Sequence, residues 1–257
     1  MEQQQASEEQ GVEQALTEEQ VQVLNEQQLI HEMLLNQHSL NMKSYNTEWI
    51  EKGTRREFDY PLAAAQEIAE FINSYGYSWW SKPVGNLTEV PLDELNCRTE
   101  IVDAVHFMLS QSIIDESVDN AVQSIHSAYT TAMGTPPSLN TRDLARVLQA
   151  RLLLSFDSDL MAATWLSNPW VTLFSLCRSM NFSLEQLSAR YLGKSRLNAF
   201  RQKHGYKEGK YTKLWDGKNE DNFFLAQWID NEPVTPTVRD IDEWLEKRYA
   251  EFTQVSL

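Results

Sequence analysis

The sequence contains very little cysteine, glycine or proline for its length. Its 257 residues include 2 Cys, 9 Gly and 8 Pro. So few glycines and prolines exclude collagen-like and loop-rich all-β chains. Cys97 and Cys177 lie far apart in apolar segments. They show neither a CxxC nor a Cys/His spacing, so the sequence predicts two buried, reduced thiols instead of a disulfide framework or a zinc site.

Long apolar runs are also missing. No run reaches the roughly 18 to 20 residues that a membrane helix needs. The N-terminus lacks the basic and then apolar layout of a secretion signal. The apolar share of 42% is nevertheless enough to bury one large core or two small ones. We therefore expect a cytoplasmic protein without a membrane partner, located in the host cytoplasm if a phage encodes it.

Positive charge is absent from the N-terminal region. The chain has 37 acidic and 22 basic side chains, a net charge of −15, and its first basic residue is Lys43. Residues 1–16 are rich in Gln and Glu and too polar to fold alone, so we predict a disordered tail. Residues 17–257 are predicted to form a single all-α domain, with a cap-like helical insert at about 111–183.

The opposite charge bias occurs between Arg190 and Lys218. This stretch holds nine basic and two acidic residues, four of the nine glycines and five aromatic residues. A basic loop with glycines can surround phosphate groups with amides and cations. The alternatives are a solvated basic face or a nucleic-acid footprint. Because the rest of the chain is strongly negative, a long polyanion would be repelled, and we expect no nucleic-acid partner.

Helical periodicity recurs along the chain, without strand alternation or an internal repeat, so the predicted fold class is all-α. Thr17 and Gln20 form a capping box at the first helix. Gly76, the Gly134–Pro137 break and a turn at Asn168 and Pro169 separate later segments, with Ser138, Asn140 or Thr141 as caps. The predicted helices span Thr17 to about Lys43, Pro61 to about Tyr75, Asp93 to about Asp115, Arg142–Phe156, Met161–Met180, Leu184–His204 and Val238–Phe252.

Two pairs of carboxylates stand one helical turn apart. Glu67 and Glu70 lie beside the apolar stripe of their helix, where a solvated acid pair is the simpler interpretation. Glu100 and Asp103 are less ordinary, because seven of the nine residues 101–109 are apolar and such a helix is buried. Buried acids need compensation that Arg98 alone cannot give. Acid pairs from facing helices supply the oxygen ligands that hard divalent cations prefer.

Several segments together resemble a known family, the dimeric all-α dUTPases within the MazG-like nucleoside triphosphate pyrophosphatases. The similarity covers roughly Leu34–Asp230, with a poorly matched middle between about 111 and 183. The matching segments are Glu67–Glu70, the aromatic Tyr77–Lys82, Glu100–Asp103 with His106, Phe107, Leu109 and Ser110, and the run Tyr191–Lys207 continuing through Gly209, Tyr211, Lys213, Trp215, Gly217 and Glu220–Asn222. The chain departs from the family pattern at Asn73, Tyr77 and Ser195.

The resemblance implies a helical bundle, a homodimer and a set of site residues. It implies that Glu67, Glu70, Glu100 and Asp103 hold two or more Mg²⁺ ions, which Mn²⁺ can replace, and that Glu67 or Glu70 is the catalytic base. The implied base-binding residues are Gln37, Asn41 and Trp80 (or Trp79), with His106 nearby. The implied phosphate-binding residues are Lys194, Asn198, Arg201, Tyr206, Lys207, Lys213 and Asn222, some of them acting across the dimer interface.

The implied reaction is Mg²⁺-dependent hydrolysis of dUTP to dUMP and pyrophosphate, with dUDP as a second substrate. Uracil and cytosine differ at one edge, and an amide such as Gln37 or Asn41 can flip to suit either. A dCTP-specific or broader pyrophosphatase therefore remains an alternative, and a non-catalytic helical binding protein is a more distant one. Large apolar residues at Trp165, Trp170, Leu173 and Phe174 could line the dimer interface.

Overall fold

The protein is an all-α bundle, as the sequence predicts. The computed structural model describes residues 16–76, 92–136, 138–154 and 168–255, and the chain forms ten helices and no β-strand within these ranges. The helices are α1 (Glu18–Tyr45), α2 (Glu48–Thr54), α3 (Tyr60–Ser74), α4 (Glu94–Asp115), α5 (Val118–Gly134), α6 (Thr141–Leu154), α8 (Pro169–Ser179), α9 (Leu184–Lys203), α10 (Asp221–Asn231) and α11 (Val238–Val255).

Side-chain caps explain where most of these helices begin. Thr17 and Gln20 form the predicted capping box of α1, and the Asp93 carboxylate accepts a hydrogen bond from the Asn96 N–H at the start of α4. Asn140 caps α6 in the same way, since its Oδ1 accepts from the Asp143 N–H. Gly76 follows α3 with φ of +86°, a conformation that favours glycine. These caps and this glycine confirm helix starts and a helix end that the sequence predicts.

Three helices differ from the sequence prediction. The prediction of one helix over Met161–Met180 is wrong. Asn168 is extended and caps α8 at the Trp170 N–H, with Pro169 in the first turn. Residues 161–167 lie outside the described ranges. Helices α2 and α10 were not predicted. Neither has a side-chain hydrogen bond at its N-cap, so the sequence offered no start signal for them.

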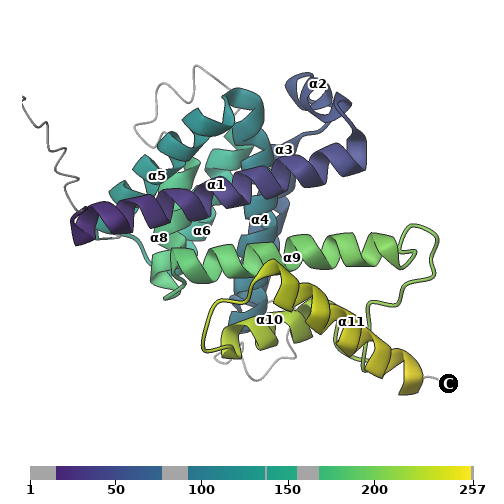
Figure 1. Cartoon of the computed structure of the whole chain (residues 1–257). Helices are drawn as coiled ribbons and strands as arrows, with labels where there is room; N and C mark the ends of the chain where they lie inside the picture. Colours follow the sequence, from purple (N-terminus) through teal and green to yellow (C-terminus); the bar gives the residue numbers. More distant parts are fainter. Residues whose placement is uncertain (1–15, 77–91, 137, 155–167, 256–257) are drawn as a thin grey trace, which may run out of the picture.

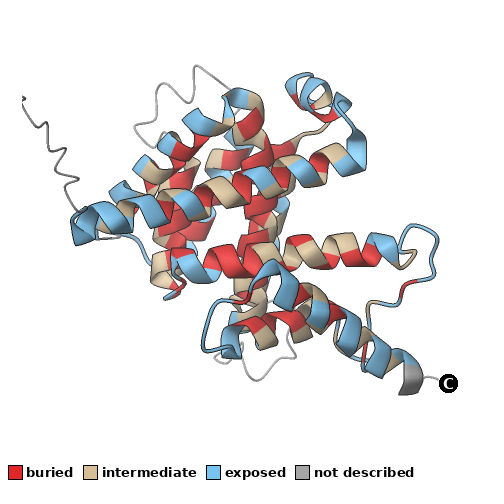
Figure 2. Ribbon diagram, viewed as in Figure 1, coloured by how far each residue is buried: buried red, intermediate tan, exposed pale blue. Residues whose placement is uncertain are grey.

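The helices are arranged around a crossing of three. Helices α1 and α9 run side by side across the front of the molecule, and α4 passes behind both (Figure 1). Helix α3 packs along α4, while α5, α6 and α8 complete the main core. Buried residues follow the faces where these helices meet (Figure 2). A second apolar cluster joins the C-terminal half of α9 to the loop after it, α10 and α11.

Large apolar residues of the middle segment serve this core. Leu173 and Phe174 are at most 1% exposed, and Trp170 is also buried. The suggestion that these three residues line a dimer interface is therefore wrong, because packing within the chain already removes them from water; Trp165 lies outside the described residues. None of the described helices combines the length and apolar character needed to cross a bilayer.

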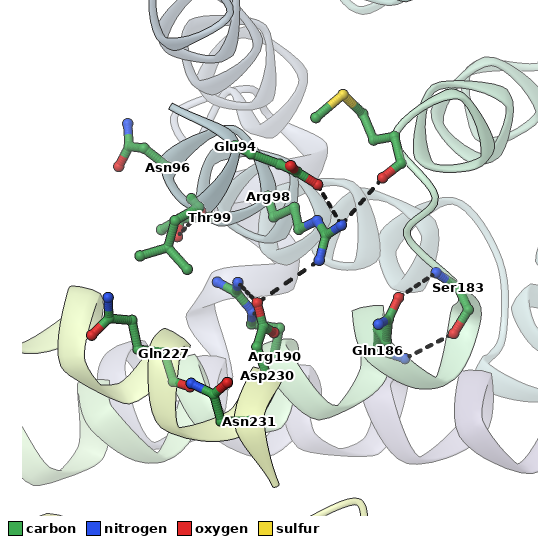
Figure 3. Close-up of polar contacts among 12 residues, drawn as sticks. Glu94, Asn96, Arg98, Thr99, Ser183, Gln186, Arg190, Gln227, Asp230 and Asn231 are labelled. Atoms are coloured by element: carbon green, nitrogen blue, oxygen red, sulfur yellow. Dashed lines mark hydrogen bonds and ion pairs between the residues drawn. The ribbon is translucent and has the colours of Figure 1, made fainter. Parts of the chain in front are cut away.

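Asp230 joins α10 to α9 and α4 through ion pairs. Its carboxylate accepts from Arg190 Nε (2.7 Å) and Nη2 (2.5 Å) on α9, and Arg98 Nη1 on α4 lies 3.8 Å away (Figure 3). Arg98 also pairs with Glu94 at 2.6 Å. Arg98 thus pairs with Glu94 and Asp230, and compensation for the inward acids must come from elsewhere.

Candidate active site

Three of the four predicted acidic residues meet between α3 and α4. One carboxylate oxygen each of Glu67, Glu100 and Asp103 lies within 4.8 Å of the others. Glu100 is buried at 7% exposure, while Glu67 and Asp103 are partly buried. Glu70 is exposed on α3, one turn beyond Glu67, and acts on the cluster through its charge. Close packing of α3 against α4 creates this acidic centre from residues more than 30 positions apart.

Lys194 of α9 supplies the local compensating charge. Its Nζ donates to Asp103 Oδ2 at 2.7 Å, and both side chains are mostly buried. Glu100 also accepts a hydrogen bond from Asn96 Nδ2 at 2.7 Å. One lysine cannot balance three carboxylates, so the centre keeps an excess of negative charge.

Burial, reinforced by neighbouring negative charge, raises the pKa of two acids. Burial, followed by the charges of Asp103 and Glu70, raises the pKa of Glu67 to about 7. The same causes raise the pKa of Glu100 to about 8. Removal from water penalises the ionised form, and neighbouring carboxylates add to this penalty. Folding therefore holds these acids where their ionised form is unfavourable, and a bound cation would offset this cost.

The donor set of this centre suits a hard divalent cation. Carboxylate oxygens are the ligands that Mg²⁺ and Mn²⁺ prefer, while water and substrate phosphates commonly complete the shell. Glu67, Glu100 and Asp103 could hold such an ion together, and no described histidine or cysteine shares their cluster.

A cavity of about 300 Å³ opens beside the acidic centre, bounded by α1, α3, α4 and α9. Six of the predicted site residues line it, namely Gln37, Asn41, Glu67, Asp103, His106 and Asn198. Ligand pockets commonly have a volume near 300 Å³ or larger. The predicted base-binding amides and two of the predicted metal ligands therefore line the same cavity.

The amide side chains on α1 are buried and joined to their neighbours. Gln37 Nε2 donates to Asn41 Oδ1 at 2.9 Å, and Asn41 Nδ2 donates to Ser110 Oγ at 3.0 Å. His106 Nδ1 lies 2.8 Å from Gln37 Oε1. Burial lowers the pKa of His106 to about 4, so this histidine is neutral at physiological pH.

The predicted phosphate-binding residues divide into three groups. Lys194 and Asn198 lie on α9 beside the acidic centre and its cavity. Asn222, at the start of α10, lines a small cavity with Lys194 and Arg190. Tyr206, Lys207 and Lys213 lie in the loop after α9, where Lys213 Nζ sits 5.2 Å from the centre of the Tyr206 ring. Trp79 and Trp80 lie outside the described residues.

Arg201 is used differently from the other predicted phosphate ligands. Its guanidinium donates to Asp221 through Nε (2.9 Å) and Nη2 (2.5 Å), and Tyr211 Oη donates to the same carboxylate at 2.7 Å. Asp221 is fully buried. In this structure Arg201 fastens the loop after α9 to α10, and its phosphate role stays a prediction.

Several cavity residues escaped the sequence analysis as site residues. They are Tyr60, Phe107, Ser110 and Gln202, with Tyr191 immediately behind the cavity. Helical spacing could have found two of them, because Phe107 and Ser110 continue the face of α4 that carries Asp103 and His106. Tyr60 and Tyr191 give no local sign, since only the tertiary structure brings them to this position.

An all-α bundle that gathers carboxylates and amide side chains around one cavity, with a lysine paired to one of the carboxylates, has the parts of a bundle-core site for a metal ion and a polar ligand. A family model described as dUTPase matches residues 29–206. The chain therefore belongs to the all-α dimeric dUTPase family, and its activity is that of a dUTP diphosphatase, which yields dUMP and pyrophosphate. No curated protein matches the chain.

Proposed function

We propose that the acidic centre is the catalytic centre of this dUTP diphosphatase and that it works with Mg²⁺. The observation that carries the proposal is the shared cavity, which has carboxylates in one wall and the Gln37 and Asn41 amides in another. Glu67, Glu100 and Asp103 would hold the ions, with Glu70 joining from the exposed face of α3. When bound, two or more Mg²⁺ ions would screen the triphosphate and polarise its phosphorus–oxygen bonds.

The side chains of the chain divide the remaining work. Glu67 lines the cavity, so it is placed better than Glu70 to accept the proton of the attacking water. The water oxygen forms a bond to phosphorus while the bond to the leaving pyrophosphate breaks in line. Lys194, already paired with Asp103, offsets charge on the phosphates together with Asn198 and Asn222. Gln37 and Asn41 bind the pyrimidine edge, with His106 beside them.

Parallel assays of the deoxynucleoside triphosphates test the substrate and the metal together. We expect pyrophosphate release from dUTP with Mg²⁺ or Mn²⁺, phosphate release from dUDP, and loss of both with EDTA, because the carboxylates need a cation. Hydrolysis that persists in EDTA would contradict the metal assignment. Equal or faster hydrolysis of dCTP would contradict the base assignment alone and would favour the alternative of a broader or dCTP-directed pyrophosphatase.

We further propose that the active form is a homodimer in which the loop after α9 completes the partner's site. Nine positions separate Lys194 from the end of α9, a distance of about 13 Å along the axis. Lys207 lies beyond that end and is exposed. Some of the corresponding family residues act across the interface, and the exposed Lys207 side chain is accessible to do the same.

Subunit mixing tests the dimer. Glu100→Gln and Lys207→Ala homodimers should each be nearly inactive, because one lacks a metal ligand and the other a phosphate ligand. In an equal mixture of subunits, about one quarter of the sites would combine an intact acidic centre with an intact loop. We therefore expect activity to recover to about that fraction. A strict monomer by light scattering, or no recovery on mixing, would contradict the cross-subunit assignment.

A further inference from the structure

Five buried side chains form a hydrogen-bonded network in the wall of the cavity, which four of them line. It links α1, α4 and α9 through Gln37, Asn41, His106, Ser110 and Tyr191. Ser110 and Tyr191 are fully buried, and the other three are at most 7% exposed. Because these side chains are largely removed from water, most of their donors and acceptors are paired with one another.

The number of protons that each group carries decides which atom donates and which accepts in each hydrogen bond of the network. The Ser110 hydroxyl has a single proton, which it donates to the His106 carbonyl at 2.9 Å. Its oxygen must therefore accept from Asn41, which turns Nδ2 of Asn41 toward Ser110 and Oδ1 toward Gln37. In the reverse orientation of Asn41, Ser110 would have to give up its bond to the His106 carbonyl and donate to Asn41 instead.

The direction then passes to Gln37 and His106. Since Asn41 Oδ1 accepts from Gln37 Nε2, the Oε1 atom of Gln37 faces His106 Nδ1 at 2.8 Å and Tyr191 Oη at 3.0 Å. Gln37 Oε1 can only accept, so the neutral His106 carries its proton on Nδ1. The Tyr191 hydroxyl is shared between Gln37 Oε1 and the Met33 carbonyl, both at 3.0 Å.

We propose that Ser110, which acts through Asn41, is a specificity-determining positioning residue that selects uracil over cytosine. In the fixed orientation, Asn41 retains one N–H and one oxygen lone pair outside the network. Uracil offers an N3–H donor beside a carbonyl acceptor, while cytosine offers the exchanged pattern, an N3 acceptor beside an amino donor. A freely flipping amide would accept both bases, whereas a fixed amide accepts one and leaves buried groups unpaired with the other. The inference rests on the proposed base-binding role of Asn41.

The ratio of kcat/KM for dUTP to that for dCTP tests this inference. In Ser110→Ala, Asn41 loses the acceptor that fixes it, and we expect the ratio to fall by about 10- to 100-fold. Ser110→Thr keeps the hydroxyl and should restore most of the ratio. Ser112→Ala on the same helix is the matched control, because its hydroxyl only accepts from Trp170 Nε1. A Ser110→Ala variant that loses activity equally on both substrates would overturn the inference.

A second readout follows the proton on His106. Nitrogen-15 NMR of the labelled protein should show His106 protonated at Nδ1, and Ser110→Ala should populate the Nε2–H form. An Nε2–H form in the wild type would mean that the network runs the other way, and would overturn the inference. Asn41→Ala distinguishes a failure of the proposed base site from a failure of the role of Ser110. If it leaves the dUTP to dCTP ratio unchanged, the proposed base site fails; if it lowers the ratio while Ser110→Ala does not, only the role of Ser110 fails.

Discussion

Replacing Glu100 by Gln is expected to lower kcat/KM for dUTP by about 10³-fold or more. Glu100 is the most buried member of the acidic centre, and its oxygen lies within 4.8 Å of both Glu67 and Asp103. The amide keeps the shape and the hydrogen bond from Asn96, but it removes a charge that a hard cation requires. Steady-state pyrophosphate release measures the effect.

The same substitution should stabilise the metal-free protein at high pH. The pKa of Glu100 in the folded protein is about 8, above the ordinary value for glutamate of about 4.3. Between these values the folded state holds a proton that the unfolded state has lost, so stability falls as pH rises through this window. Glu100→Gln removes this loss, and we expect its Tm in EDTA at pH 8 to exceed that of the wild type by about 4 °C or more.

A matched control separates this effect from general charge removal. Glu94→Gln lies on the same helix, where Glu94 is exposed and pairs with Arg98. Such a surface pair contributes about 0–1 kcal/mol, so this variant should keep its activity and its Tm. A Glu100→Gln variant with wild-type turnover would contradict the assignment of Glu100 to the catalytic centre.

Replacing Asp221 by Ala should lower the free energy of unfolding by about 3–5 kcal/mol, because it leaves the charge of Arg201 buried without its partner. Asp221 is 0% exposed and Arg201 is 7% exposed. The carboxylate accepts three side-chain hydrogen bonds, two from Arg201 and one from Tyr211. Urea unfolding of the purified protein gives the measurement.

The loss of the Asp221 carboxylate should also weaken substrate binding at the catalytic centre. The Asp221 carboxylate accepts from Tyr211 in the loop after α9 and from the Asn222 backbone N–H at 2.8 Å, and Asn222 lines a cavity with Lys194. We therefore expect a raised KM for dUTP as well. Glu246→Ala is the control, because its pair with Lys203 is exposed and its removal should change stability by at most about 0.5 kcal/mol. A fully stable Asp221→Ala protein would contradict the role of this ion pair.

The sequence predicted the helical class and most helix termini because these depend on local chemistry. Thr17, Asp93 and Asn140 cap helices through hydrogen bonds that span only a few residues. At α2 and α10 no side chain caps the N-terminus, and neither helix was predicted. Packing against the rest of the bundle stabilises those helices, and local pattern does not record it.

The acidic centre was partly determined by sequence as well. An acid inside an almost entirely apolar helix marks Glu100 as exceptional, because burial of an unpaired charge is costly. The partner could not be derived in the same way. Lys194 compensates Asp103 from a position 91 residues away, and the exposure of Glu70 beside the partial burial of Glu67 depends on how α3 rotates against α4.

By itself the sequence determined the fold class, most helix caps and the exceptional position of Glu100 and Asp103 in an apolar helix, because these follow from residue type and short-range spacing; Glu67 and Glu70 were implied only by the family resemblance. Only the tertiary structure decided which side chains share the cavity, how Arg201 is used and in which direction the Ser110–Asn41–Gln37 network runs. These features depend on contacts between helices distant in sequence. A hydrogen bond or ion pair of that kind is set by packing, which no local pattern encodes.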